Sequence, residues 1–351
     1  MSASEPEDVG APDAGMPSEF AADIMARQPF RGYELTACLA ADDRRAVFKA
    51  TDRNMDRTVA VKVMRPFPGR AGVVEEFFSL AGSIARLRCA GAVRGLDAGR
   101  GDGDFFLAYE FAAGESLAAK LARRQTGRLT EKESLKTIRE TAGVLHNLFE
   151  LGHPHGNLKP ANLVLGDGGK AKLLDIGFAW TLAWPDDQAA FAACPDFLPP
   201  ERIREDLNVD IRGDLYSLGA IWHWLLTGEP VFRGLTPADT LAMHLEKKPV
   251  SVRELDPRLS AATANLVLWL MKKDRDARPR TPREFLRKLR SHPLLQEEGG
   301  GDVEAGDEEA EEGASPPAED AEEQPSGPIQ KPAGDTAAPE ADKSTEEEAE
   351  G

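Results

Sequence analysis

Two short polar motifs at a fixed spacing constrain this chain more than any other feature of its sequence. Residues 153–165 read His-Pro-His-Gly-Asn-Leu-Lys-Pro-Ala-Asn-Leu-Val-Leu, and ten residues later residues 175–177 read Asp-Ile-Gly. Asn162 and Asp175 supply the hard oxygen donors that Mg²⁺ requires. Asn and Asp also favour turns, so each residue alone could simply mark a turn. The spacing that the two motifs share argues against two unrelated turns.

A third motif, Val-Ala-Val-Lys at residues 59–62, precedes the first by about 95 residues. A lysine at the edge of an apolar strand is commonplace, so this motif is informative only because of its spacing. Together the three resemble Val-Ala-Ile-Lys, His-Arg-Asp-Leu-x-x-x-Asn and Asp-Phe-Gly of Hanks-type Ser/Thr protein kinases. Weaker matches at residues 199–201, 214–219 and 274–279 extend the resemblance over residues 30–295.

The resemblance implies an α+β, bilobal protein kinase-like fold with a small β-rich N-lobe and a larger α-helical C-lobe. The pattern agrees: residues 47–52, 58–63 and 104–111 are typical of strands, whereas helical segments dominate from Ser116 onward. The helices are expected at residues 73–88, 135–151, 214–226, 236–245, 261–271 and 282–289. We predict a disordered acidic leader (1–28), an N-lobe (29–112), a C-lobe (113–295) and a disordered acidic tail (296–351).

The resemblance also assigns site residues. Lys62 would pair with nucleotide phosphates, Asn162 and Asp175 would hold Mg²⁺, and Lys159 would contact the transferred phosphate. Val47, Ala60 and Val164 hold the positions whose apolar side chains would sandwich the adenine. Glu110 and Ala112 lie at the hinge, and Tyr109 is the bulky gatekeeper behind the adenine. ATP with Mg²⁺ is therefore the expected ligand. The alternative is a structural Lys62–Asp175 ion pair that closes an empty cleft. Glu201 and Arg278 should form a buried ion pair.

The catalytic loop departs from the family pattern at its most important position. Asn157 stands where the family has the Asp that accepts the substrate hydroxyl proton. A neutral amide has no useful basicity, so a contribution of about 10²–10⁴-fold should be lost. Gly156 replaces the Arg that clamps a phosphorylated activation segment, and Cys194 replaces a Thr that contacts the catalytic Asp. Residues 175–201 keep one Ser or Thr, Thr181.

The phosphate-covering loop and the following helix depart as well. The family pattern Gly-x-Gly-x-x-Gly falls on residues 40–45, which contain no glycine. Glycine there lets backbone N–H groups approach phosphates closely, and the carboxylates of Asp42 and Asp43 should repel them. The helix Glu that would hold Lys62 aligns with Leu80. Glu76, one turn earlier on the same face, could replace it if the helix shifts by one turn.

Charge and composition limit the remaining possibilities. The net charge is −17, but residues 296–351 hold 20 acidic and 2 basic residues, and residues 1–28 hold 6 and 1. The middle is therefore mildly basic, at +6, and the tail is too polar to bury a core. Its simplest interpretation is a solvated tail; the alternative is a polyanion that acts on a basic partner or on the body. Three scattered cysteines and no apolar span of about 18–20 residues indicate a reducing, cytoplasmic setting.

These observations favour a pseudokinase with impaired phosphoryl transfer that acts as a scaffold or regulator of protein partners, with Mg-ATP as a possible ligand. No nucleic-acid or membrane partner is expected. A second hypothesis is a Ser/Thr protein kinase of low activity, because phosphoryl transfer depends mostly on positioning and charge neutralisation. A third makes the acidic tail the working part, as a binding arm for basic partners.

Overall fold

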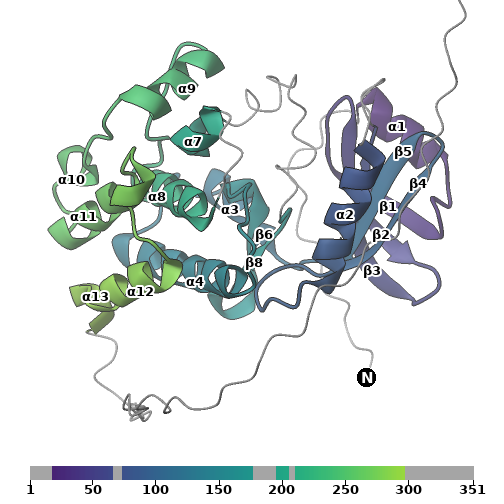
Figure 1. The fold of residues 1–351 in the computed structure, drawn as a ribbon, viewed down its shortest axis with the longest axis horizontal. Coiled ribbons are helices and arrows are strands. Elements are labelled where there is room, and N and C mark those ends of the chain that lie inside the picture. Colours follow the sequence, from purple (N-terminus) through teal and green to yellow (C-terminus); the bar gives the residue numbers. More distant parts are fainter. Residues whose placement is uncertain (1–17, 66–72, 177–194, 205–209, 297–351) are drawn as a thin grey trace, which may run out of the picture. The chain divides into compact units, whose positions relative to one another are not determined.

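The protein, represented by a computed structural model, is described at residues 18–65, 73–176, 195–204 and 210–296, except for the side chains of residues 73, 76, 80 and 167. Residues 1–302 form one compact unit and residues 303–351 another. Apart from Gln296, the predicted acidic tail lies outside the described residues. Within the first unit, a sheet-rich N-lobe precedes a helical C-lobe (Figure 1), which confirms the predicted fold class.

A five-stranded antiparallel sheet forms the framework of the N-lobe. Its spatial order is β1 (Tyr33–Ala41), β2 (Arg45–Asp52), β3 (Arg57–Met64), β5 (Asp104–Glu110) and β4 (Gly95–Gly101). Strand β2 buries every second residue, as expected when alternate side chains enter different environments. The strands expected at residues 47–52, 58–63 and 104–111 are therefore confirmed. Because β3 lies between β2 and β5, Lys62 projects from the middle of the sheet.

Each face of this sheet is covered by one helix. Helix α2 (Val73–Arg86) packs Phe77, Ala81 and Ile84 on the face that carries Leu107 and Tyr109. Helix α1 (Glu19–Ala26) covers the opposite face, where its apolar residues pack with Phe30, Tyr33, Phe48, Val61 and Phe106. Figure 1 shows α2 running along the sheet, with α1 at the far end of the strands. Lys62 lies on the α2 face, because its neighbours Val61 and Val63 belong to the α1 face.

Helix α1 corrects the prediction that residues 1–28 are a disordered leader; residues 1–17 lie outside the described residues. Phe20, Ala21 and Ile24 form an apolar stripe on α1 that is buried against the sheet. Beyond it, the fully buried carboxylate of Asp104 accepts hydrogen bonds from Arg27 (3.0 Å) and Arg65 (2.9 Å). The leader is acidic on average, so its composition predicts disorder. Its three apolar residues Phe20, Ala21 and Ile24 belong to the core only because the sheet covers them.

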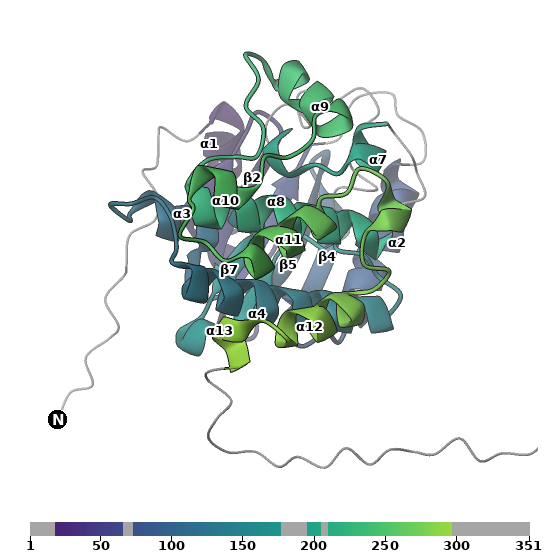
Figure 2. The same ribbon diagram turned by 90° about the vertical axis from the view of Figure 1, so that its left-hand side faces the viewer.

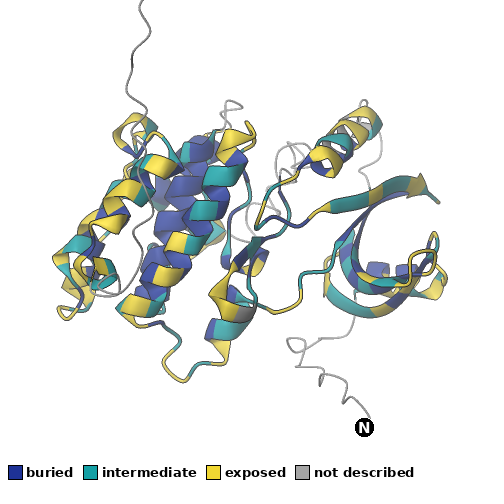
Figure 3. Cartoon of the chain, turned by 90° about the horizontal axis from the view of Figure 1, so that it is seen from below, coloured by how far each residue is buried: buried dark blue, intermediate teal, exposed yellow. Residues whose placement is uncertain are grey.

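The C-lobe is organised around α8 (Ile211–Thr227), an almost entirely buried helix. It lies between α4 (Glu131–Glu150) and α9 (Pro237–Glu246), and it also packs on α11 (Ala261–Leu270) (Figures 1 and 2). The other helices are α3 (Leu117–Ala122), α7 (Pro200–Ile203), α10 (Val252–Leu255), α12 (Pro282–Arg290) and α13 (Pro293–Gln296). Figure 3 shows that the inner faces of these helices are buried and their outer faces exposed. The expected C-lobe helices are therefore confirmed.

A small sheet holds the two polar motifs at the edge of the C-lobe facing the N-lobe. Strands β6 (Glu115–Ser116), β7 (Leu163–Leu165) and β8 (Ala171–Leu173) pair in that order. Strand β8 is tied to the segment between α2 and β4, because Val93 N–H donates to Leu173 O (3.0 Å) and Leu173 N–H donates to Gly91 O (2.7 Å). These two bonds fix the C-lobe motifs relative to the N-lobe.

Two expectations from composition concern the whole chain. Among the described residues, no helix combines the length and apolarity needed to cross a bilayer. Cys38 and Cys89 are free thiols, as predicted, whereas Cys194 lies outside the described residues.

The docking of α1 can be tested by shortening one side chain. Ile24 is fully buried, so Ile24→Ala should lower the free energy of unfolding by about 2–4 kcal/mol in urea denaturation. Met55→Ala is the matched control, because Met55 is 65% exposed and should change that free energy by no more than about 0.5 kcal/mol. Equal effects of the two substitutions would mean that α1 is not part of the core.

Candidate functional site

The loop of residues 153–162 is held mainly through its backbone. Its principal anchor is Asp214 on α8, whose carboxylate accepts hydrogen bonds from the N–H groups of His155 (2.7 Å) and Gly156 (2.8 Å). Gly156 has φ 76°, a left-handed conformation that glycine adopts without steric cost. Burial raises the pKa of the Asp214 carboxyl to about 7, against the two N–H groups that favour its charged form. Sequence analysis identified Asp214 only as the start of a helix.

His155 is the second anchor, and its two ring nitrogens have different partners. Asn157 N–H donates to Nδ1 (3.1 Å), so Nδ1 carries no proton and Nε2–H donates to Leu174 O (2.8 Å). The ring is therefore neutral. Burial lowers the pKa of His155 to about 4, although Asp175 and the Leu174 carbonyl oppose this shift. The bond to Leu174 joins the first polar motif to the second, one residue before Asp175.

Asn157 itself lies half-buried in this loop. Its backbone carbonyl accepts a hydrogen bond from Asn162 Nδ2 (2.9 Å), and Asn162 N–H donates to Lys159 O (2.9 Å). With the nitrogen of the Asn162 amide used in this way, its oxygen is the atom that can coordinate a cation. The structure thus brings Asn157, Lys159 and Asn162 together as the sequence predicts, with an amide at the base position.

Lys62 and Asp175 form an ion pair with Nζ 2.9 Å from Oδ1. Asp175 adopts φ 60°, which aspartate tolerates better than most residues. Burial alone would raise the pKa of the Asp175 carboxyl, but the ammonium group of Lys62, assisted by Lys159, keeps it below its ordinary value. The carboxylate is therefore charged at neutral pH. This contact is the ion pair that the alternative interpretation of the sequence anticipated.

The predicted adenine-lining residues lie on the N-lobe sheet, at the hinge and on the small sheet of the C-lobe. Val47 is the direct cross-strand partner of Lys62, so both side chains project from the same face of the sheet. Ala60 and Ala112 pack against the cluster around Tyr109. Val164 is buried and is paired in register with Ser116, just beyond the hinge.

The hinge carries one ion pair that sequence analysis missed. Glu110, the last residue of β5, forms a close salt bridge with Lys172 on β8, and its N–H donates to Arg94 O (2.9 Å). Lys172 lies between two buried residues of β8, so its polar side chain must leave the core. No sequence signal specified the hinge as its target.

The gatekeeper position is filled by a buried tyrosine. Tyr109 packs with Phe77, Phe105 and Leu107 on the α2 face of the sheet. Its pKa is raised well above the ordinary value by burial and then by the charge of Asp175, so the phenol is neutral at physiological pH. The gatekeeper position thus holds a bulky, buried side chain; that it closes a space behind a cleft stays a prediction.

Some predicted features lie outside the described residues. They are the side chains of Glu76 and Leu80, together with Thr181 and Cys194, so the pairing of Lys62 with Glu76 stays a prediction. The predicted Glu201–Arg278 pair is confirmed. Arg278 donates to both carboxylate oxygens of Glu201 (2.7 and 2.8 Å), and both residues are buried. Such a pair anchors the fold, because losing one partner leaves an uncompensated buried charge.

The fit of Mg-ATP to these residues differs between the two sides of the cleft. Lys62, Asn162 and Asp175 provide the charge and the oxygen donors that the group needs. The loop over the phosphates does not fit, because Asp42 places a carboxylate there and its oxygens accept hydrogen bonds from that loop. Within the described ranges, no cluster of three or more His, Cys, Asp or Glu residues could hold a metal by itself.

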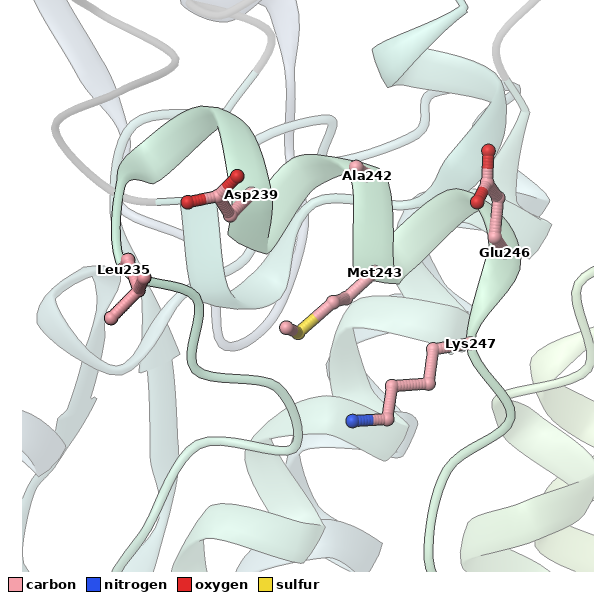
Figure 4. Close-up of a pocket in the computed structure, with 6 residues that line it drawn as sticks. All are labelled: Leu235, Asp239, Ala242, Met243, Glu246 and Lys247. Carbon is pink, nitrogen blue, oxygen red and sulfur yellow. The ribbon is translucent and has the colours of Figure 1, made fainter.

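A surface hollow elsewhere on the C-lobe does not include any predicted site residue. It is formed by α9 and the preceding turn (Figure 4), and its lining consists of Leu235, Asp239, Ala242, Met243, Glu246 and Lys247.

Comparisons with known proteins agree with this arrangement. The model of the protein kinase domain matches residues 44–294. Serine/threonine-protein kinase pkn2 of Myxococcus xanthus is 30% identical over 251 residues, covering 68% of this chain and 30% of that protein. Serine/threonine-protein kinase PknB of Mycobacterium tuberculosis is 29% identical over 262 residues, covering 72% and 41%. The chain therefore spans less than half the length of these curated relatives.

A solved structure supports the fold in particular. The crystal structure of the Mycobacterium tuberculosis PknI kinase domain superposes with a TM-score of 0.60 at 22% identity, covering 74% of this chain and 96% of that one.

The neutral His155 generates a pH prediction. Its pKa is about 4 in the folded protein and about 6.5 when unfolded, so the unfolded state binds the proton more tightly. His155 therefore contributes up to about 3 kcal/mol above pH 6.5, and this contribution is lost as the pH falls towards 4. In urea denaturation from pH 7 to pH 4, His155→Gln should lose less stability than the wild type.

The control for this experiment is His153→Gln, at an exposed position in the same loop. The buried His223, with a pKa lowered to about 4, and Asp214 remain in all three proteins, so the difference between them isolates His155. A pH dependence of His155→Gln identical to that of the wild type and of His153→Gln would rule out a neutral His155.

Proposed function

Because the chain belongs to the Hanks-type Ser/Thr protein kinase family, we propose that it is a pseudokinase, a kinase-like domain that binds protein partners as a scaffold or regulator and does not transfer phosphate efficiently. The observation that carries this proposal is the amide of Asn157 at the base position, within a loop that otherwise keeps its frame. A kinase needs a group there that accepts the hydroxyl proton of the substrate, and an amide cannot do so.

The two carboxylates described above, Asp214 and Asp175, are both engaged within the protein. Asp214 is 3% exposed and receives the backbone N–H groups of His155 and Gly156. Asp175 is paired with Lys62. A proton acceptor must reach the substrate hydroxyl within hydrogen-bond distance, and both of these groups are committed to contacts within the protein.

The second candidate is a Ser/Thr protein kinase of low activity. The preserved Lys62–Asp175 contact and the ordered Asn162 favour it, because they are the parts that position the nucleotide and neutralise its charge. In that case water or the phosphate itself would take up the proton. A bound ATP and Mg²⁺ would be held by Lys62, Asn162 and Asp175 in either candidate.

Phosphate transfer from labelled ATP separates these candidates. With a generic basic protein as acceptor, the wild type should transfer no faster than Asp175→Ala, which removes a predicted Mg²⁺ ligand. Robust transfer that disappears in Asp175→Ala would refute the pseudokinase proposal.

Restoring the carboxylate refines the test. If Asn157 were the only defect, Asn157→Asp should raise transfer by about 10²-fold or more. The pseudokinase proposal predicts a much smaller gain, because the phosphate-covering loop is also altered. A gain of the full size would indicate a largely intact site and would favour the low-activity kinase.

A further inference from the structure

The carboxylate of Asp42 caps the turn between β1 and β2. Asp42 Oδ1 accepts hydrogen bonds from the backbone N–H groups of Arg44 (3.0 Å) and Arg45 (2.8 Å), and Oδ2 accepts one from Arg45 Nε (2.7 Å). The N–H of Asp42 donates to Arg45 O (2.8 Å). A single side chain therefore engages two consecutive backbone donors and one charged donor of the turn.

The same turn is fastened from outside at two points. Ser18, the N-cap of α1, donates its hydroxyl to Asp42 O (2.9 Å). On the other side, Arg65 N–H donates to Arg44 O (2.8 Å), and Arg44 Nε donates to Arg65 O (3.3 Å). Two of these bonds hold backbone carbonyls of the turn and the third holds the Arg44 side chain, so α1 and the end of β3 fasten the turn in addition to Asp42.

The donors engaged by Asp42 lie in the segment that covers phosphates in kinases. Backbone N–H groups bind phosphate because they present unsatisfied positive dipoles to an anion. Here the anion is already present as a carboxylate. An incoming phosphate would have to displace that carboxylate from Arg44 and Arg45 and then remain beside its negative charge.

The phosphate end and the hinge end of the candidate site differ in charge. At the phosphate end, the charge of Lys62 is balanced by Asp175. At the hinge end, Ala60 and Ala112 pack against the apolar cluster of Tyr109, and Val164 is buried. These positions are therefore apolar, as a purine would require, whereas the Asp42 carboxylate occupies backbone donors that would meet a triphosphate.

We propose that the Asp42 carboxylate serves as an internal substitute for phosphate, so that the cleft prefers an uncharged purine nucleoside to ATP. This inference rests on the proposed function, because a cleft that does not transfer phosphate need not bind it. It identifies Asp42 as the residue that determines ligand specificity and the nucleoside as the ligand class.

Calorimetric titration of the full chain with adenosine, ADP and ATP, each with and without Mg²⁺, tests the proposal. The wild type should bind adenosine at least as tightly as ATP. Asp42→Gly should tighten ATP binding by about tenfold or more, the effect of losing a charge-assisted cap and its repulsion. The same substitution should change adenosine binding by less than about threefold, and this also verifies that the cleft is folded.

Asp43→Gly is the matched control. Asp43 is exposed, carries the same charge one residue further along the turn, and leaves the Asp42 contacts in place. It should change ATP affinity by less than about threefold. This result would show that the Asp42 hydrogen bonds, and not simply a negative charge on the turn, weaken ATP binding. Asp42→Asn, which keeps an acceptor oxygen without the charge, should give an intermediate gain.

Several outcomes would overturn the inference. They are wild-type ATP binding that is tenfold tighter than adenosine binding, an unchanged ATP affinity in Asp42→Gly, an equal gain in Asp43→Gly, or no binding of any of these ligands by any variant. The proposed function fails by a different measurement, Asp175-dependent phosphate transfer by the wild type, so the two failures can be told apart.

Discussion

The buried carboxylate of Asp214 is the contact on which the site depends. It fixes the N–H groups of His155 and Gly156, while the ring of His155 joins the loop to Leu174 and Asn162 holds the carbonyl of residue 157. All of these bonds are made to the backbone or to residues other than the side chain at position 157. The frame of the loop can therefore persist after the catalytic carboxylate is lost, because that carboxylate is not what holds it.

The same reasoning applies to charge in the cleft. In an active kinase, the lysine, the metal ions and the loop amides bind the phosphates of a nucleotide. In this chain, Lys62 already has Asp175 as a partner, and the loop amides of Arg44 and Arg45 already have Asp42. Both pairings lower the need for an external anion. The ammonium group of Lys62 and the two loop amides are thus compensated from within the chain.

The sequence predicted what depends on motif spacing and on periodicity. The strands β2, β3 and β5, the helix α8 and the Glu201–Arg278 pair all follow from such patterns. The helix α1 did not, because its three apolar residues become a core only when the outer face of the sheet is present to receive them.

The hydrogen-bond and ion-pair partners of individual polar side chains could not be predicted from the sequence either. Lys172 reaches Glu110 through the pairing of separate elements. The motif alignment places Asp42 in the turn, but whether it repels a phosphate or caps the turn is decided by the local backbone geometry. Such contacts depend on a few ångströms of tertiary placement, which no spacing rule specifies.

The loop of residues 153–162 should keep its backbone hydrogen bonds whatever residue occupies position 157. Amide hydrogen exchange at His155 and Gly156 tests it most directly, because exchange reports the opening of individual hydrogen bonds. The account predicts equal protection in the wild type and in Asn157→Asp, and a marked loss of protection in Asp214→Ala. A change in Asn157→Asp as large as that in Asp214→Ala would contradict it.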